Sequence, residues 1–131
     1  MQKEELESKC ERKLGCSMQE LFYLIERFQA YATHHEDDKR VMDLKSFKDM
    51  LGMLGNFFIS DRMFSAIDIN HDGMISLEEF LVYNDIISHG TEEEKTLITF
   101  RMIDTSGDEL VSFDEFKRFW THFIQLYGEA L

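Results

Sequence analysis

The sequence predicts an all-α protein made of three helix–loop–helix units, with very short β pairing between their loops. Apolar residues recur mostly at three- and four-residue spacing, which is the period of a helix buried along one face. The 131 residues contain no proline. The second half of the chain repeats itself at an offset of 36 residues, which indicates two copies of one unit.

The composition excludes several classes of protein. The chain carries 14 basic and 26 acidic residues, a formal net charge of −12, and such a surface repels phosphate backbones, so no nucleic-acid partner is expected. Apolar residues make up 44% of the chain, which is enough for a packed core. The apolar runs are too short for a transmembrane segment. Cys10 and Cys16 do not suggest a disulfide framework, which favours a reducing, cytoplasmic compartment.

Three segments follow one another along the chain. Residues 1–16 are rich in Glu and Lys with a thin apolar stripe, and they form a regular or frayed helix or a linker. Residues 17–90 hold the first two units, and residues 91–131 hold the third unit with its exit helix. Capping boxes at 17–20 and 91–94 mark two helix starts. The expected helices cover about residues 17–32, 47–54, 60–67 (capped by Ser60 or Asp61), 80–87, 91–103 and 114–127.

The repeat is carried by two matched stretches. Residues 64–68 match residues 100–104, and residues 74–80 match residues 110–116, in both cases 36 positions apart. Two such matches at equal spacing indicate a duplicated supersecondary unit.

The loop at residues 68–79 carries a complete cation-binding pattern. It has acid or amide residues at alternate positions, a central glycine and a final glutamate, and a hard cation such as calcium takes about six to eight such oxygens. Gly73 provides the left-handed turn, and Ile75 points into the core, where it can pair with a neighbouring loop. The expected ligands are Asp68, Asn70, Asp72, the backbone carbonyl of Met74, Ser76 directly or through water, and both oxygens of Glu79. One strong Ca²⁺ site is therefore predicted here.

The loop at residues 104–115 keeps the ligand positions but departs from the pattern twice. Ser106 replaces the usual acid or amide, and Glu109 stands in place of the glycine, where a left-handed backbone costs on the order of 1 kcal/mol. The expected ligands are Asp104, Ser106, Asp108, the backbone carbonyl of Leu110, Ser112 and Glu115. A weaker Ca²⁺ site is predicted, with an empty structural loop as the alternative.

The loop of the first unit is degenerate. It can be aligned in two frames, and neither has a central glycine or a final glutamate. One frame uses His35, Asp37, Lys39 and Ser46, and the other uses Ala32, His34 and Glu36. This loop is not expected to bind calcium, and it lacks the Cys or second His spacing of a zinc site. Its expected task is to hold a partner loop through Val41 and Met42.

With these loops in place, the chain resembles EF-hand proteins over about residues 17–127. The stretches 89–95 and 100–104 are similar to the hinge and third hand of the neuronal calcium sensor and calcineurin-B-like families, and equally to the EF-hand regulatory region of the dual oxidases. Those families also tend to have a degenerate first hand. The sensors carry a fourth hand, and many have a Met-Gly acylation signal, whereas this chain ends after hand three and begins Met1-Gln2. No myristoylation signal is therefore expected, and the chain is either a short member or a regulatory module of a longer protein.

The resemblance and the loops favour a calcium sensor or regulatory module. Ion binding would neutralise clustered carboxylates, reorient the flanking helices and expose a groove lined by Met and Phe. The expected partner is a target helix or a segment of the parent protein. A calcium buffer and a constitutive structural subunit are the alternatives. An enzyme is not expected, because no phosphate loop, nucleophile elbow or zinc-protease motif is present in the sequence.

Three units leave one without a mate. Units one and two are expected to pair across residues 41–42 and 74–75, because residues 88–91 resemble the hinge between lobes. The exit helix of unit three carries one continuous apolar face, formed by Phe116, Phe119, Trp120, Phe123, Ile124 and Tyr127. This face either packs on the first lobe or is buried in a homodimer or against a partner helix.

Overall fold

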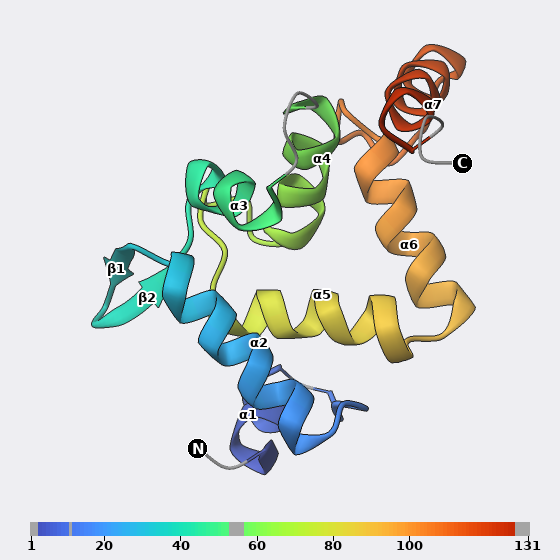
Figure 1. Ribbon diagram of the computed structural model, residues 1–131. Helices are drawn as coiled ribbons and strands as arrows, with labels where there is room; N and C mark the ends of the chain where they lie inside the picture. Colours follow the sequence, from blue (N-terminus) through green and yellow to red (C-terminus); the bar gives the residue numbers. More distant parts are fainter. Residues whose placement is uncertain (1–2, 11, 53–56, 128–131) are drawn as a thin grey trace.

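The computed structural model describes residues 3–10, 12–52 and 57–127, without the side chains of 57–59 and 122–127. Helices joined by short loops make up most of it (Figure 1), so the predicted all-α class is confirmed. The helices are α1 (Lys3–Cys10), α2 (Met18–Tyr31), α3 (Leu44–Leu51), α4 (Phe57–Ile67), α5 (Leu77–His89), α6 (Glu92–Ile103) and α7 (Phe113–Tyr127). The strands are β1 (His34–Glu36) and β2 (Lys39–Val41).

Side-chain caps fix the starts of several helices. The Ser17 hydroxyl accepts a hydrogen bond from the N–H of Glu20 at 3.2 Å and caps α2 as expected. Thr91 and Glu94 form the expected capping box of α6, with bonds of 3.0 and 3.1 Å. Each bond satisfies a backbone N–H that the first turn of a helix leaves without a partner.

The second predicted helix was placed wrongly. α3 begins at Leu44 rather than near residue 47, because the Asp43 carboxylate accepts a bond from the N–H of Ser46 at 2.9 Å and caps the helix earlier. The helix ends at Leu51, where Gly52 takes the left-handed conformation at φ 62°. The end expected near residue 54 falls on residues 53–56, which lie outside the described part.

The next two helices are longer than expected. α4 begins at Phe57, so Ser60 is buried inside the helix and neither it nor Asp61 is a cap. α5 begins at Leu77 because Ser76 caps it, three residues before the predicted start. Ser76 therefore has two tasks, as a loop residue and as the N-cap of α5, and the ligand pattern predicts only the first.

The first loop is a β-hairpin that the sequence analysis did not foresee. β1 and β2 pair antiparallel, with His34 opposite Val41. Asp37 and Asp38 form the turn with φ values of 49° and 64°, the left-handed conformation that two-residue hairpins require. Aspartate tolerates this conformation better than most residues, so the loop closes on itself as a hairpin.

A backbone bridge joins the first loop to the second. The N–H of Met42 donates to the carbonyl of Ile75 at 2.9 Å, and the N–H of Ile75 donates to the carbonyl of Met42 at 2.8 Å. Both side chains are fully buried. The short pairing that was expected between these loops is therefore present.

The main core lies between the first two units. Phe28 of α2 packs on Phe80 of α5, with ring centroids 5.5 Å apart, and Phe47 of α3 packs on Phe64 of α4 at 5.8 Å. Met42 and Ile75 lie in the same cluster, so the inter-loop bridge is anchored by this core.

The N-terminal segment is part of the folded body. α1 packs along α5, and Leu6, Leu14 and Cys16 are buried with Leu21 and Leu81 in a second cluster. The described residues of 1–16 therefore form a packed helix and turn rather than a linker.

The third unit packs on α4. Ile103 of α6 and Phe119 of α7 form a small cluster with Met63 of α4. Phe119 is 3% exposed, whereas Phe116 and Trp120 are 46% and 37% exposed. One member of the predicted apolar face is thus buried within the chain, while the side chains of Phe123, Ile124 and Tyr127 lie outside the described part. Along the described stretches, no helix combines the length and apolar character needed to cross a membrane.

Candidate metal centres

The loop between α4 and α5 folds back on its own first residue. Asp68 is buried at the end of α4, and its carboxylate accepts bonds from the N–H of Gly73 at 2.9 Å and of Asp72 at 3.3 Å. The side-chain oxygen of Asn70 also accepts from the N–H of Asp72 at 3.3 Å. Gly73 has φ 82°, which is the left-handed turn that the sequence predicted at this position. Three of the predicted ligands therefore meet around one turn.

The last residue of this loop reaches back to its beginning. One carboxylate oxygen of Glu79 accepts from the N–H of Ile69 at 2.9 Å, and the other accepts from the N–H of Ser76 at 3.0 Å. The hydroxyl of Ser76 accepts from the N–H of Glu79 at 3.1 Å and completes a capping box. Glu79 thus starts α5 and closes the loop with the same carboxylate.

The loop between α6 and α7 repeats this arrangement. The Asp104 carboxylate accepts bonds from the N–H groups of Gly107 at 3.1 Å and Glu109 at 2.9 Å. The Ser106 hydroxyl donates to the same carboxylate at 3.2 Å, and Asp108 accepts from the N–H of Leu110 at 2.9 Å. The two loops are therefore alike in backbone as well as in sequence.

The Glu115 carboxylate accepts three hydrogen bonds in this loop, one more than the Glu79 carboxylate accepts in the other. It accepts from the N–H groups of Ser112 and Ser106, both at 3.0 Å, and from the Thr105 hydroxyl at 2.9 Å. The residue that corresponds to Thr105 in the other loop is Ile69, which has no side-chain donor. Thr105 could not be predicted from the sequence because the ligand pattern leaves its position unrestricted.

Three carboxylates gather in the loop of the third unit. One oxygen from each of Asp104, Asp108 and Glu115 lies within 4.8 Å of the others, and no second group of this kind occurs among the described residues. The N–H groups of Ser112 and Ser106 lower the pKa of Glu115 to about 2, and the N–H of Leu110 lowers the pKa of Asp108. Glu115 is therefore ionised at neutral pH, which suits a hard divalent cation.

Asp68 differs from Asp108 and Glu115, whose pKa values are lowered. Burial raises the pKa of its carboxyl, and the N–H of Gly73 offsets part of this effect. A buried carboxylate costs free energy unless a positive charge or hydrogen bonds compensate it. The residues of this loop thus also fit a cation, which would compensate the burial of Asp68.

Glu109 takes the strained conformation that the sequence predicted for it. Its φ is 66°, close to the value of Gly73 at the same loop position. A residue with a Cβ pays about 1 kcal/mol for this conformation. We expect the ion-free loop to relax from this conformation and the filled loop to be held in it, so that the cost falls on ion binding.

Replacing Glu109 with Gly is therefore expected to raise the Ca²⁺ affinity of this loop by about fivefold, equivalent to about 1 kcal/mol. The comparison variant is Glu109→Gln, which removes the same charge but keeps the Cβ. Isothermal titration calorimetry of both variants measures the difference. Weaker binding by the Gly variant than by the Gln variant would show that the side chain at this position helps to hold the ion.

A family comparison identifies the two loops. A family model described as an EF-hand domain pair matches residues 61–121, a stretch that runs from α4 into α7 and includes both loops. Residues 61–121 are an EF-hand pair. The resemblance to EF-hand proteins is confirmed, and an EF-hand is a calcium-binding unit.

Curated proteins similar to this chain include calcium-binding proteins. Calaxin of Bos taurus is 32% identical over 56% of the chain and 36% of its own length. The calcium-binding protein NCSA of Dictyostelium discoideum is 28% identical over 64% of the chain and 46% of its own length. A recoverin family protein of the same organism is 34% identical over 47% of the chain and 28% of its own length. The chain thus spans less than half the length of these curated relatives.

The candidate ligands of the first unit are not brought together in an EF-hand loop. They lie on the β1–β2 hairpin and its flanks, and His34 pairs instead with Asp43, the cap of α3, at 2.9 Å. The other frame places His35, Asp37 and Lys39 along the exposed hairpin. The hairpin is consistent with the prediction that this loop binds no calcium.

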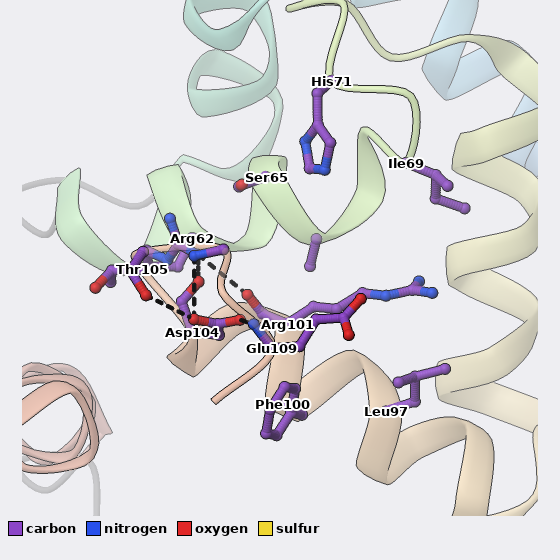
Figure 2. Close-up of a pocket in the computed structure, with 13 residues that line it drawn as sticks. Arg62, Ser65, Ile69, His71, Leu97, Phe100, Arg101, Asp104, Thr105 and Glu109 are labelled. Atoms are coloured by element: carbon purple, nitrogen blue, oxygen red, sulfur yellow. Dashed lines mark hydrogen bonds between the residues drawn. The ribbon is translucent and has the colours of Figure 1, made fainter. Parts of the chain in front are cut away.

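A cavity of about 740 Å³ lies between the two EF-hand loops (Figure 2). Ala66 and Ile69 line it from the α4 side, and Leu97 and Phe100 line it from α6. Figure 2 shows Arg62 at one end of this cavity, bonded to the backbone where α6 ends. No sequence motif predicted a role for Arg62.

Proposed function

We propose that this chain is a calcium sensor or regulatory module with a stronger site at 68–79 and a weaker one at 104–115. The observation that carries the proposal is the closing glutamate of each loop, which reaches back to the first residues of its own loop. Glu79 bonds to the N–H of Ile69, and Glu115 bonds to the N–H of Ser106. Each closing glutamate therefore lies beside the start of its own loop, as a wrapped cation requires.

Bound Ca²⁺ would supply the positive charge that these clustered carboxylates lack. In response, the chain's own helices would move, because each closing glutamate is also the first-turn residue of the exit helix, α5 or α7. α7 carries exposed apolar residues in Phe113, Phe116 and Trp120. When α7 moves, this apolar surface could bind an amphipathic target helix or a segment of a longer parent protein.

The alternatives are a calcium buffer and a constitutive structural subunit, because both would keep the same loops. The partner could also be a second copy of this chain. The exposed apolar residues of α7 would then form a homodimer interface through the third hand. The loop carboxylates are accounted for as ligands, so no catalytic role is proposed for them. A cytoplasmic location belongs to the same proposal, since both cysteines are free thiols.

A calcium-specific gain in exposed apolar surface is the test that separates a sensor from a buffer. Addition of Ca²⁺, but not of Mg²⁺, is expected to raise the fluorescence of a hydrophobic dye and to shift the emission of Trp120, the single tryptophan. The matched control is the double variant Glu79→Gln with Glu115→Gln, which should give neither change. Calorimetric binding without either change would favour the buffer, and no binding at all would contradict the proposed function.

A further inference from the structure

Arg62 joins the second hand to the third. It lies on α4, and its Nε donates to the carbonyl of Met102 at 2.8 Å. One of its terminal nitrogens donates to the carbonyls of Arg101 and Asp104, each at 3.0 Å (Figure 2). These carbonyls belong to the last turn and cap of α6, where the helix has no further N–H groups to pair with and a cation is favourable.

The position of Arg62 connects the two calcium loops. α4 leads directly into the loop 68–79, and its hydrogen bonding continues into the first ligand, since the N–H of Asp68 donates to the carbonyl of Phe64 at 2.9 Å. At its other end, Arg62 holds the carbonyl of Asp104, which is the first residue of the loop 104–115. A single side chain therefore runs from the helix that enters one loop to the first ligand residue of the other.

Strand pairing does not provide this connection. Ile75 of the second hand exchanges its backbone bonds with Met42 of the first hand. In the described residues, no bridge joins Ile75 to Val111, its counterpart in the third hand. The contact with α4 is consequently a direct route between the two loops, and Met63, next to Arg62, adds apolar packing against Ile103 and Phe119.

We propose that Arg62 is a positioning residue that couples the two calcium loops. A shift of α4 when the loop 68–79 fills is transmitted through Arg62 to Asp104, so that the first site sets the affinity of the second. This inference rests on the proposed function, in which both loops bind Ca²⁺. The planar guanidinium holds three carbonyls in one fixed geometry, whereas the three N–H donors of a lysine ammonium rotate on a flexible stem.

A double-mutant cycle tests the coupling. The four proteins are the wild type, Glu79→Gln, Arg62→Lys and the combination of both, and calorimetry with Trp120 fluorescence measures the Ca²⁺ affinity of the loop 104–115 in each. In the wild-type background, loss of the first site is expected to change this affinity by about fivefold or more. In the Arg62→Lys background, the change is expected to fall below about twofold. Because lysine keeps the positive charge, the direct electrostatic effect of residue 62 on the bound ion is the same in both backgrounds and cancels in the comparison.

The matched control is Arg27→Lys. Arg27 is also half-buried and also donates to the carbonyl at the end of a helix, that of Met50 at 2.9 Å, but it lies within the first hand. This variant should leave the coupling unchanged. In the calcium-free protein, Arg62→Lys but not Arg27→Lys is expected to speed amide hydrogen exchange in the last turn of α6, with unchanged helix content by circular dichroism.

Equal coupling in the wild type and in Arg62→Lys, or no coupling in the wild type when both loops bind, would overturn the proposal for Arg62. A wild-type protein in which calorimetry detects no Ca²⁺ binding would instead overturn the proposed function, and the coupling with it. The number of bound ions in the wild type therefore distinguishes the two failures.

Discussion

Glu79→Gln is expected to lower the Ca²⁺ affinity of the loop 68–79 by on the order of 100-fold, or about 2.7 kcal/mol. The change removes one negative charge and one of the two oxygens that close the loop. The fold should survive, because glutamine can still accept the N–H of Ser76 in the capping box that starts α5. Calorimetry on the variant should show the tighter site missing and the weaker site retained.

Glu78→Gln is the matched control for this experiment. Glu78 precedes Glu79 in the first turn of α5 and carries the same charge, but the loop pattern gives it no ligand role. Loss of its charge should lower the Ca²⁺ affinity only slightly, because the attraction between an exposed charge and the ion is screened by solvent and salt. An intact tight site in Glu79→Gln, or an equal loss in Glu78→Gln, would show that Glu79 is not the closing ligand.

Both loops could be located from sequence because the information that specifies them is local. The spacing of the carboxylates falls within 12-residue segments, and the repeat places the second such segment 36 residues after the first. The strained φ of Glu109 also followed from its position alone, since the backbone of a wrapped loop requires a left-handed residue there.

The first loop was harder to predict because the ligand pattern was the wrong guide. A missing glycine and glutamate excluded a calcium loop but did not say what replaces it. The feature that indicates a hairpin is the Asp37–Asp38 pair, which lies between two short polar segments. Both residues tolerate the left-handed conformation that the turn requires. The hairpin then places Met42 beside Ile75, which explains why the expected pairing forms despite the different loop.

Arg62 and Arg12 were missed because their partners are far away in the sequence. Arg62 bonds to backbone carbonyls about forty positions later, and backbone acceptors leave no trace in residue identity. Arg12 pairs with Asp85 and Glu94, on two different helices. The helical period of a sequence does not predict which charged residues far apart in the chain will form an ion pair. These contacts could therefore be found only in the structure.

Asp85→Ala is expected to destabilise the protein by about 3 kcal/mol, because it leaves a partly buried arginine without the more buried of its two counter-charges. The Asp85 side chain is 3% exposed and accepts bonds from Arg12 at 2.7 Å and from the N–H of Gly15 at 2.8 Å. Both partners lie in the N-terminal segment, so the loss should loosen its packing on α5. Thermal unfolding should show a fall of roughly 10 °C in Tm.

A matched control and a second variant show whether the ion pair is the cause. Asp49→Ala removes an exposed aspartate from α3 and should change the free energy of unfolding by less than about 0.5 kcal/mol. Arg12→Ala should cost less in the Asp85→Ala background than in the wild type, because the buried pair is already broken. Strictly additive costs would mean that Asp85 acts through Gly15 alone. Coupled costs would show that the Arg12–Asp85 pair holds the N-terminal segment on α5, while Arg12 also bonds to Glu94 of α6 at 2.6 Å.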